Sequence, residues 1–156
     1  MNFFNGTVVL PDRLASGQFL QVQNGRIAGL SDTRPTDSSD ASIDLDGGYL
    51  VPGFIDLHVH GGAGHDFMDG TAAAFDAVCR CHARHGTTSV AATSTAADDQ
   101  YVLRFLRECR AAKSRSTGGA RVLGAHFYGP YFAVNARGVH PSAPIRAPEE
   151  SEFSHY

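Results

Sequence analysis

The chain has 156 residues, of which 42% are hydrophobic and 19% charged, and 13 Lys and Arg against 16 Asp and Glu give a formal net charge of −3. This balance excludes collagen-like, strongly disordered and strongly basic nucleic-acid-binding compositions. No run approaches the roughly 20 apolar residues that cross a bilayer, and residues 1–6 lack the pattern of a signal peptide. Three cysteines cannot form a closed set of disulfides, so we expect a cytoplasmic location. From the composition and the lack of a long apolar run we expect no nucleic-acid or membrane partner.

The N-terminal third predicts short strands joined by turns. Apolar and β-branched runs predict strands at residues 7–10, 19–23, 26–30 and 43–46. Asn24-Gly25 separates two of these runs and is a strong signal for a two-residue hairpin. Residues 31–40 are polar and rich in turn formers, so we expect a loop there. Residues 1–47 are therefore expected to be the N-terminal part of a small β-sandwich domain.

After Tyr49 the pattern changes to strands that alternate with helices. We expect strands at 54–60, 87–93 and 121–127, and helices at 71–85 and 97–113, the first capped by Thr71. Such alternation is typical of parallel βα units, whereas four prolines after Gly129 predict a loop with no closing element. The expected fold class is α/β. Residues 48–156 would be the truncated N-terminal part of a TIM-like (β/α) barrel, with about three βα units, preceded by the small β-sandwich module.

The strand expected at 54–60 carries the most informative pattern. Strand alternation gives it a face with Phe54, Asp56, His58 and His60, and an opposite face with Ile55, Leu57 and Val59. We expect the aliphatic face to pack beneath the helices. The two histidines would then stand at the carboxyl end of the strand, where barrel enzymes place their chemistry. Two neutral imidazoles one residue apart can converge on a divalent metal such as Zn²⁺. A bare His-x-His also recurs by chance, but this context favours metal ligation.

Two blocks of sequence resemble a known family. Residues 51–61 read Val-Pro-Gly-Phe-Ile-Asp-Leu-His-Val-His-Gly and resemble the first-strand signature of the metal-dependent amidohydrolase superfamily. Residues 123–132 and 138–141 resemble the His-x-Glu-Gly-Pro and Gly-x-His block of the N-acetylglucosamine-6-phosphate deacetylase family, with matches at His126, Gly129, Pro130, Gly138 and His140. The resemblance follows the whole chain in element order, but it covers only the N-terminal portion of the family's length.

The resemblance implies roles for individual residues. His58 and His60 would hold a divalent metal, with zinc as the first candidate and iron or another divalent ion as the alternative. Val139 and His140 would bind the substrate, and His140 would polarise the scissile carbonyl. Tyr128 stands where the family has a metal-binding glutamate. A phenol is a poor ligand unless the metal ionises it, so we expect one metal ion rather than a bridged pair.

The same resemblance implies a hydrolase of a C–N bond. The full-length enzyme would deacetylate N-acetylglucosamine 6-phosphate to glucosamine 6-phosphate and acetate, in amino-sugar catabolism, and we expect it to be a homo-oligomer. The family's general-base aspartate comes from a later strand, so the chain is expected to be an inactive N-terminal part. Two alternatives stay open. One is another amidohydrolase, such as a cyclic-amide hydrolase or a deaminase. The other is a non-catalytic remnant or binding module, which Tyr128 favours.

Overall fold

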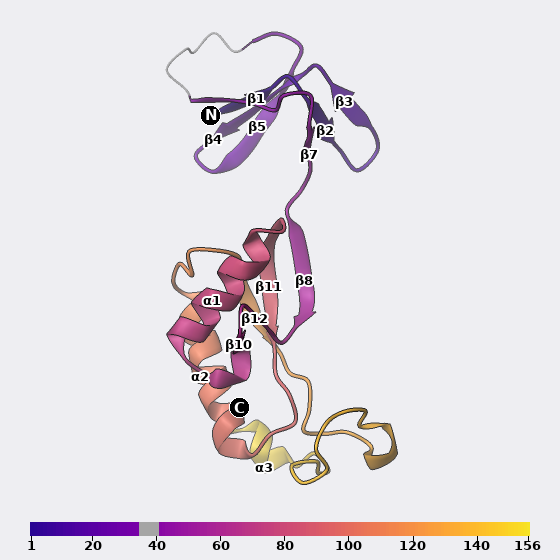
Figure 1. Cartoon of the computed structure of the whole chain (residues 1–156), viewed down its shortest axis with the longest axis vertical. Helices are drawn as coiled ribbons and strands as arrows, with labels where there is room; N and C mark the ends of the chain where they lie inside the picture. Colours follow the sequence, from indigo (N-terminus) through magenta and orange to yellow (C-terminus); the bar gives the residue numbers. More distant parts are fainter. Residues whose placement is uncertain (35–40) are drawn as a thin grey trace. The chain divides into compact units, whose positions relative to one another are not determined.

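The computed structural model describes residues 1–34 and 41–156, which divide into two compact units, Met1–Pro52 and Gly53–Tyr156 (Figure 1). Residues 35–40 of the expected loop lie outside the described part. No helix in the described ranges has the length and apolar character needed to cross a membrane. The α/β class expected from the sequence is confirmed, with strands in the first unit and both strands and helices in the second.

The first unit consists of two small sheets. Its strands are β1 (Asn2–Phe4), β2 (Thr7–Val9), β3 (Leu14–Ser16), β4 (Phe19–Gln23), β5 (Arg26–Ser31), β6 (Ser42–Asp44) and β7 (Tyr49–Leu50). One sheet has the order β5-β4-β1-β6 and the other β3-β2-β7. Val8, Ala15 and Leu20, from strands of both sheets, form their shared buried cluster.

The hairpin predicted at Asn24-Gly25 is confirmed. β4 and β5 pair antiparallel on either side of it, and both turn residues have positive φ, 52° and 71°. A type I′ turn needs positive φ at both central positions, which explains why these two residue types occur there. The unit extends beyond the boundary expected at residue 48, because Tyr49–Leu50 pairs in parallel with β2.

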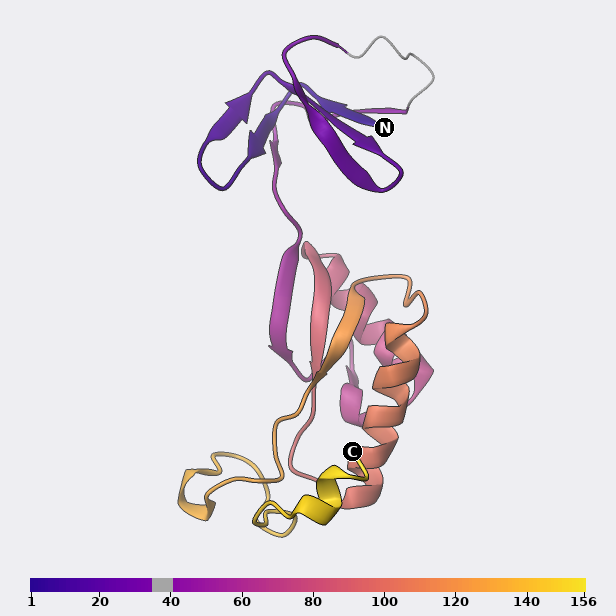
Figure 2. The ribbon, with the colours of Figure 1, turned by 180° about the vertical axis from the view of Figure 1, so that it is seen from behind.

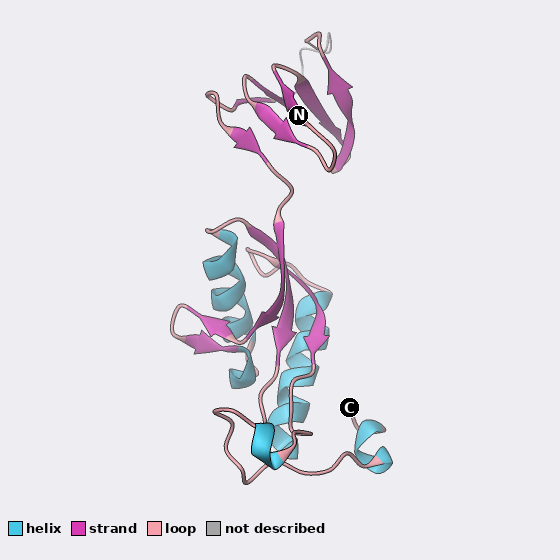
Figure 3. Cartoon of the chain, turned by 90° about the vertical axis from the view of Figure 1, so that its right-hand side faces the viewer, coloured by secondary structure: helices cyan, strands magenta, loops and turns pink. Residues whose placement is uncertain are grey.

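The second unit is built on a three-stranded parallel sheet. Its strands are β8 (Phe54–Val59), β11 (Thr87–Thr93) and β12 (Arg121–His126), in the order β12-β11-β8, and their arrows point the same way in Figure 3. The helices α1 (Ala72–Ala83) and α2 (Asp99–Lys113) connect them in chain order, and Figure 2 shows α2 running beside β12. A short hairpin, β9 (Gly61–Gly62) and β10 (His65–Asp66), and the 3₁₀ turn η1 (Phe67–Asp69) follow β8.

The expected Thr71 cap is confirmed, since its hydroxyl accepts a hydrogen bond from the Ala74 amide at 3.2 Å. The core of the unit lies between the helices and the sheet. Phe67, Phe75 and Phe105 are completely buried there, with ring centroids 4.7 Å apart for the first pair and 6.2 Å for the second. Burial of three aromatic rings provides much of the hydrophobic stabilisation of this unit.

A network of partly buried ion pairs also joins the two helices. Arg115, just after α2, bonds to Asp76 of α1 and, at 2.9 Å, to Glu108 of α2. All three side chains are at most 30% exposed. The hydrogen bond that Arg115 donates to Asp76, followed by the one that it donates to Glu108, raises the pKa of Arg115.

The expectation that the aliphatic face of β8 packs beneath the helices is wrong for two of its three residues. Val59 is buried, but Ile55 and Leu57 are 62% and 65% exposed. The physical reason is that β8 is an edge strand, while α2 packs on β12 and α1 packs on β11 and the β9–β10 hairpin.

The segment after Gly129 also differs from the expected featureless loop. It contains the 3₁₀ turn η2 (Val134–Ala136) and the short helix α3 (Glu150–Phe153). Glu149 provides the extended N-cap residue of α3, two positions after Ala147 and directly after Pro148. The prolines of this segment therefore interrupt regular structure without preventing a helix from starting after the last of them.

Candidate metal site

Two imidazoles converge at the carboxyl end of β8. The strand ends at Val59, so His58 is its penultimate residue and His60 follows it directly. Their Nε2 atoms are 3.1 Å apart, and their ring centroids are 4.9 Å apart at an edge-to-face angle of 83°. The backbone amide of His58 donates to the Asp56 carboxylate at 3.0 Å, which fixes the strand locally. The alternation of side chains along the strand therefore brings the two rings together, as the sequence pattern predicts.

The end of β12 adds two more rings to the same place. The His126 ring lies 4.9 Å from that of His58, and the Tyr128 ring lies 4.8 Å from it. Tyr128 is also 6.0 Å from the His60 ring. The sequence motif included His126 only as a matching position, without a site role. His126 lies at the carboxyl end of a parallel strand, and one strand separates it from β8. This position in the sequence pattern is the signal that could have predicted that the His126 ring lies near the His58 ring.

The loop after β12 brings His140 to the cluster. Gly129 has φ +82°, and a Cβ there would lie 2.9 Å from the Ala96 nitrogen, so only glycine fits this turn. Farther along, the His140 ring stacks on Phe132 with centroids 4.6 Å apart and faces Tyr128 at 5.2 Å. Its neighbour Val139 is 99% exposed. The structure therefore brings His140 to the two strand histidines through Tyr128, while Val139 points into solvent.

Arg146 closes this loop, here called the 130–146 loop. Its amide donates to the Pro130 carbonyl at 3.4 Å. Its guanidinium bonds to Glu152 of α3 at 2.6 Å and to the Tyr156 hydroxyl at 3.0 Å. A hydrogen bond from Tyr131 is the first cause that lowers the pKa of Glu152, and Arg146 contributes in the same direction. The two ends of the loop are therefore fastened to each other and to α3.

The electrostatic setting favours a neutral imidazole at His60. Burial is the first cause that lowers its pKa, and the neighbouring His58 ring is the second. The Nδ1 atom of His60 is buried and has no hydrogen-bond partner among the described residues, and the backbone of Thr93 acts on the pKa of His60 in the opposite direction to burial. A neutral imidazole is the form that binds metals.

The spacing of the two imidazole nitrogens fits a metal ion. A tetrahedral zinc ion with Zn–N distances near 2.05 Å holds its ligand atoms about 3.3 Å apart. The 3.1 Å between Nε2 of His58 and Nε2 of His60 is close to that value. Within residues 1–34 and 41–156, however, no group of three or more His, Cys, Asp or Glu residues is placed to hold a metal. The described chain thus supplies two converging imidazole nitrogens and not a complete ligand set.

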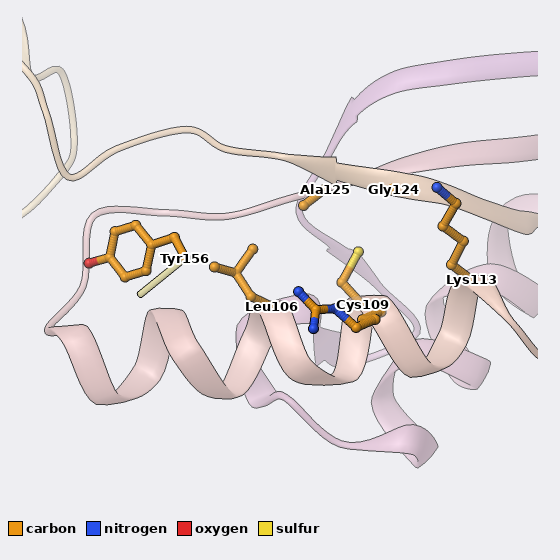
Figure 4. Close-up of a pocket in the computed structure, with 7 residues that line it drawn as sticks. Leu106, Cys109, Lys113, Gly124, Ala125 and Tyr156 are labelled. Atoms are coloured by element: carbon orange, nitrogen blue, oxygen red, sulfur yellow. The ribbon is translucent and has the colours of Figure 1, made fainter. Parts of the chain in front are cut away.

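A separate groove lies between α2 and β12 and holds a cavity of about 220 Å³ (Figure 4). Tyr156 stands at one end and Lys113 at the other, and Leu106 and Cys109 project from α2 between them. None of the histidines of the candidate site lines this groove. The groove and the candidate metal site are therefore different features of the second unit.

Comparison with known proteins defines the class to which this arrangement belongs. The model of the Amidohydrolase family matches residues 49–154, and the chain belongs to that family. The resemblance noted in the two sequence blocks is thereby confirmed.

Its relatives narrow the class. The N-acetylglucosamine-6-phosphate deacetylase of Bacillus subtilis is 30% identical over 150 residues, which cover 94% of this chain and 38% of that protein. The N-acetylgalactosamine-6-phosphate deacetylase of Escherichia coli O157:H7 is 33% identical over 134 residues, covering 86% of this chain and 34% of that one. The crystal structure of the N-acetylglucosamine-6-phosphate deacetylase from Pasteurella multocida superposes with a TM-score of 0.89 at 27% identity, over 98% of this chain and 40% of that chain. The chain thus spans between a third and two-fifths of the length of these relatives.

Proposed function

We propose that this chain is the N-terminal part of a metal-dependent hydrolase that removes the acetyl group of N-acetylglucosamine 6-phosphate, in amino-sugar catabolism. The observation that carries the proposal is the convergence of His58 and His60, with Nε2 atoms 3.1 Å apart, at the carboxyl end of a parallel strand. Membership of the Amidohydrolase family and the two deacetylase relatives support it.

The fold that we propose for the whole enzyme is a (β/α) barrel, of which β8, β11 and β12 are the first strands, preceded by the small β-sandwich of the first unit. Three observations support it: the strands are parallel, their order follows the chain, and helices connect them. In a closed barrel the edge of β8 would pair with a further strand, and the exposed Ile55 and Leu57 would be covered.

The metal ligands that we propose from this chain are the Nε2 atoms of His58 and His60, completed by residues that later strands supply. When bound, one divalent ion, zinc or iron, would polarise the acetyl carbonyl and lower the pKa of a coordinated water. His140 would donate a hydrogen bond to the carbonyl oxygen, where negative charge develops in the transition state. Phe132 and Tyr128 would hold the His140 ring in that orientation by their stacking and edge contacts.

The general base is not assigned to any residue of this chain, so we propose that residues 1–156 alone are inactive. A cytoplasmic location is consistent with three free cysteines, Cys79, Cys81 and Cys109. The substrate partner would be a small amino-sugar phosphate, and the full-length enzyme a homo-oligomer.

The test of this function is acetate release by the whole enzyme, stripped of metal and then supplied with Zn²⁺ or Fe²⁺. N-acetylglucosamine 6-phosphate and its galactosamine epimer are both assayed, because the relatives include a deacetylase named for each of these sugar phosphates. We expect metal-dependent release from one of them, and a loss of at least a hundredfold in the His58→Ala variant. His85→Ala serves as the matched control, since His85 is exposed and follows α1. Equal activity of metal-free and metal-loaded enzyme would refute the proposal.

The non-catalytic alternative rests on one specific residue, Tyr128, at the position where the resembled family has glutamate. A remnant or binding module would bind the sugar phosphate without releasing acetate. The same assay therefore separates the two, provided that binding of the sugar phosphate is measured by calorimetry in parallel.

A further inference from the structure

Two buried hydroxyl groups stand at the carboxyl end of β11, between the strands that carry the candidate site. Thr93 is the last residue of β11 and Ser94 follows it, and both are 0% exposed. A buried hydroxyl must find hydrogen-bond partners to offset the cost of leaving water. The hydrogen-bond partners of Thr93 and Ser94 therefore indicate what these two residues do.

The Thr93 hydroxyl holds the end of β8. It accepts a hydrogen bond from the Val59 amide at 2.9 Å, and Val59 lies between the two site histidines in the chain. The backbone pairing of β11 with β8 ends at Ala92 opposite Val59. The same hydroxyl is 3.4 Å from Nδ1 of His126 on the other neighbouring strand. One side chain thus contacts the ends of both flanking strands.

The Ser94 hydroxyl holds the segment after β12. Pairing of β11 with β12 ends at Thr93 opposite His126, so regular strand pairing no longer fixes Tyr128. The Ser94 side chain takes the place of this backbone pairing. Its Oγ accepts from the Tyr128 amide at 2.7 Å and donates to the Tyr128 carbonyl at 3.2 Å. The hydroxyl therefore mimics a backbone pair one step beyond the end of the strand.

We propose that Thr93 and Ser94 are positioning residues, which set the spacing of the His58–His60 pair and of Tyr128 through hydrogen bonds to the backbone beside them. The inference rests on the proposed metal site. Outer residues that orient metal ligands commonly change metal affinity by about 10- to 100-fold when they are removed. Each hydroxyl acts on a backbone group next to a site residue, so its loss would let the end of the strand shift.

The experiment compares Thr93→Val and Ser94→Ala with a matched control, Thr117→Val, in the whole enzyme, because later strands complete the proposed ligand set. Thr117 is also buried, at 4% exposed, and its hydroxyl makes two hydrogen bonds, to the Ala120 carbonyl at 2.8 Å and from the Gly119 amide at 3.2 Å. It precedes β12, at the opposite end of that strand from His126. Its replacement should cost comparable stability without touching the site.

Two readouts are made on each variant. The first is the dissociation constant of Co²⁺, measured from its visible absorption on binding. The second is the imidazole ¹H–¹³C spectrum of the metal-free chain, where the edge contacts of the His58 ring with Tyr128 and His126 produce ring-current shifts. We expect weaker Co²⁺ binding, by about tenfold or more, and altered His58 shifts in Thr93→Val and Ser94→Ala. Both quantities should be unchanged in Thr117→Val.

The conservative variant Thr93→Ser keeps the hydroxyl and should bind Co²⁺ as the wild type does. If it binds as weakly as Thr93→Val, or if Thr93→Val and Ser94→Ala match the wild type in both readouts, the inference is wrong. A whole wild-type enzyme that binds no Co²⁺ overturns the proposed metal site instead. The ring-current shifts of the metal-free variants then still decide whether the two hydroxyls position the rings.

Discussion

Replacing Tyr128 with glutamate should convert a weak cation site into a tighter one. The Tyr128 ring lies 4.8 Å from the His58 ring and 6.0 Å from the His60 ring, so its side chain already points at the proposed ligand pair. A neutral phenol contributes little charge there, whereas a carboxylate contributes a full negative charge. The Tyr128→Glu variant therefore restores the donor that the resembled family has at this position.

The size of the effect follows from Coulomb's law. A carboxylate and a dication about 5 Å apart attract by roughly 2 kcal/mol at the dielectric constant of water and by roughly 7 kcal/mol at an effective value of 20. Because the carboxylate also loses hydration, the lower figure is the better guide. It corresponds to a dissociation constant at least about tenfold lower.

The assay is equilibrium dialysis of the whole enzyme against Zn²⁺, with metal counted per chain, for the wild type, Tyr128→Glu and Tyr128→Phe. We expect one ion per wild-type chain, the same affinity in Tyr128→Phe, and tighter binding in Tyr128→Glu. Loss of the ion in Tyr128→Phe would mean that the phenol is itself a ligand. Unchanged or weaker binding in Tyr128→Glu would refute the placement of the ion beside this residue.

Three further predictions concern the second unit. Arg115→Met should lower the free energy of unfolding by about 2 kcal/mol in a urea titration, because it breaks the partly buried ion pairs of Arg115 with Asp76 and Glu108. The control, Arg107→Met on the exposed face of α2, should change that free energy by less than about 0.5 kcal/mol. Burial raises the pKa of Cys109 to about 11, so at pH 8 only about one thiol in a thousand is ionised. Iodoacetamide should therefore label the half-exposed Cys81 first, and early modification of Cys109 in peptide mass spectra would contradict this. The lowered pKa of Glu152 means that its contribution to holding α3 is complete above its ordinary value of 4.5 and is lost as the pH falls through the lowered value. Protection of the amides of residues 150–156 from hydrogen exchange, corrected for the intrinsic rate at each pH, should therefore fall in that acidic range, and Glu152→Gln should abolish the transition.

Local patterns in the sequence were sufficient for several elements of the fold. Asn24-Gly25 predicts its hairpin because only a few residue types tolerate positive φ at both turn positions. Thr71 predicts the start of α1 because its hydroxyl satisfies a free backbone amide. Alternation along β8 likewise predicts that His58 and His60 share a face, because a strand has a period of two.

Other features depend on packing that no local pattern records. The exposure of Ile55 and Leu57 follows from which strand lies at the edge of the sheet. The approach of His140 to Tyr128 depends on a loop that brings together residues twelve positions apart. The roles proposed for Thr93 and Ser94 could not be predicted from the sequence, since a threonine in a strand is already explained by β-propensity and Ser94 lies just after the strand.

The fastening of the 130–146 loop by Arg146 has an evolutionary consequence. The backbone amide of Arg146 bonds to Pro130 at the start of the loop, and its guanidinium bonds to Glu152 of α3, so the stretch between them can change in sequence while its two ends stay fixed. Val134 and Val139 are 62% and 99% exposed, so their side chains contribute little to packing. Selection could therefore diversify the exposed part of this loop independently of His58 and His60.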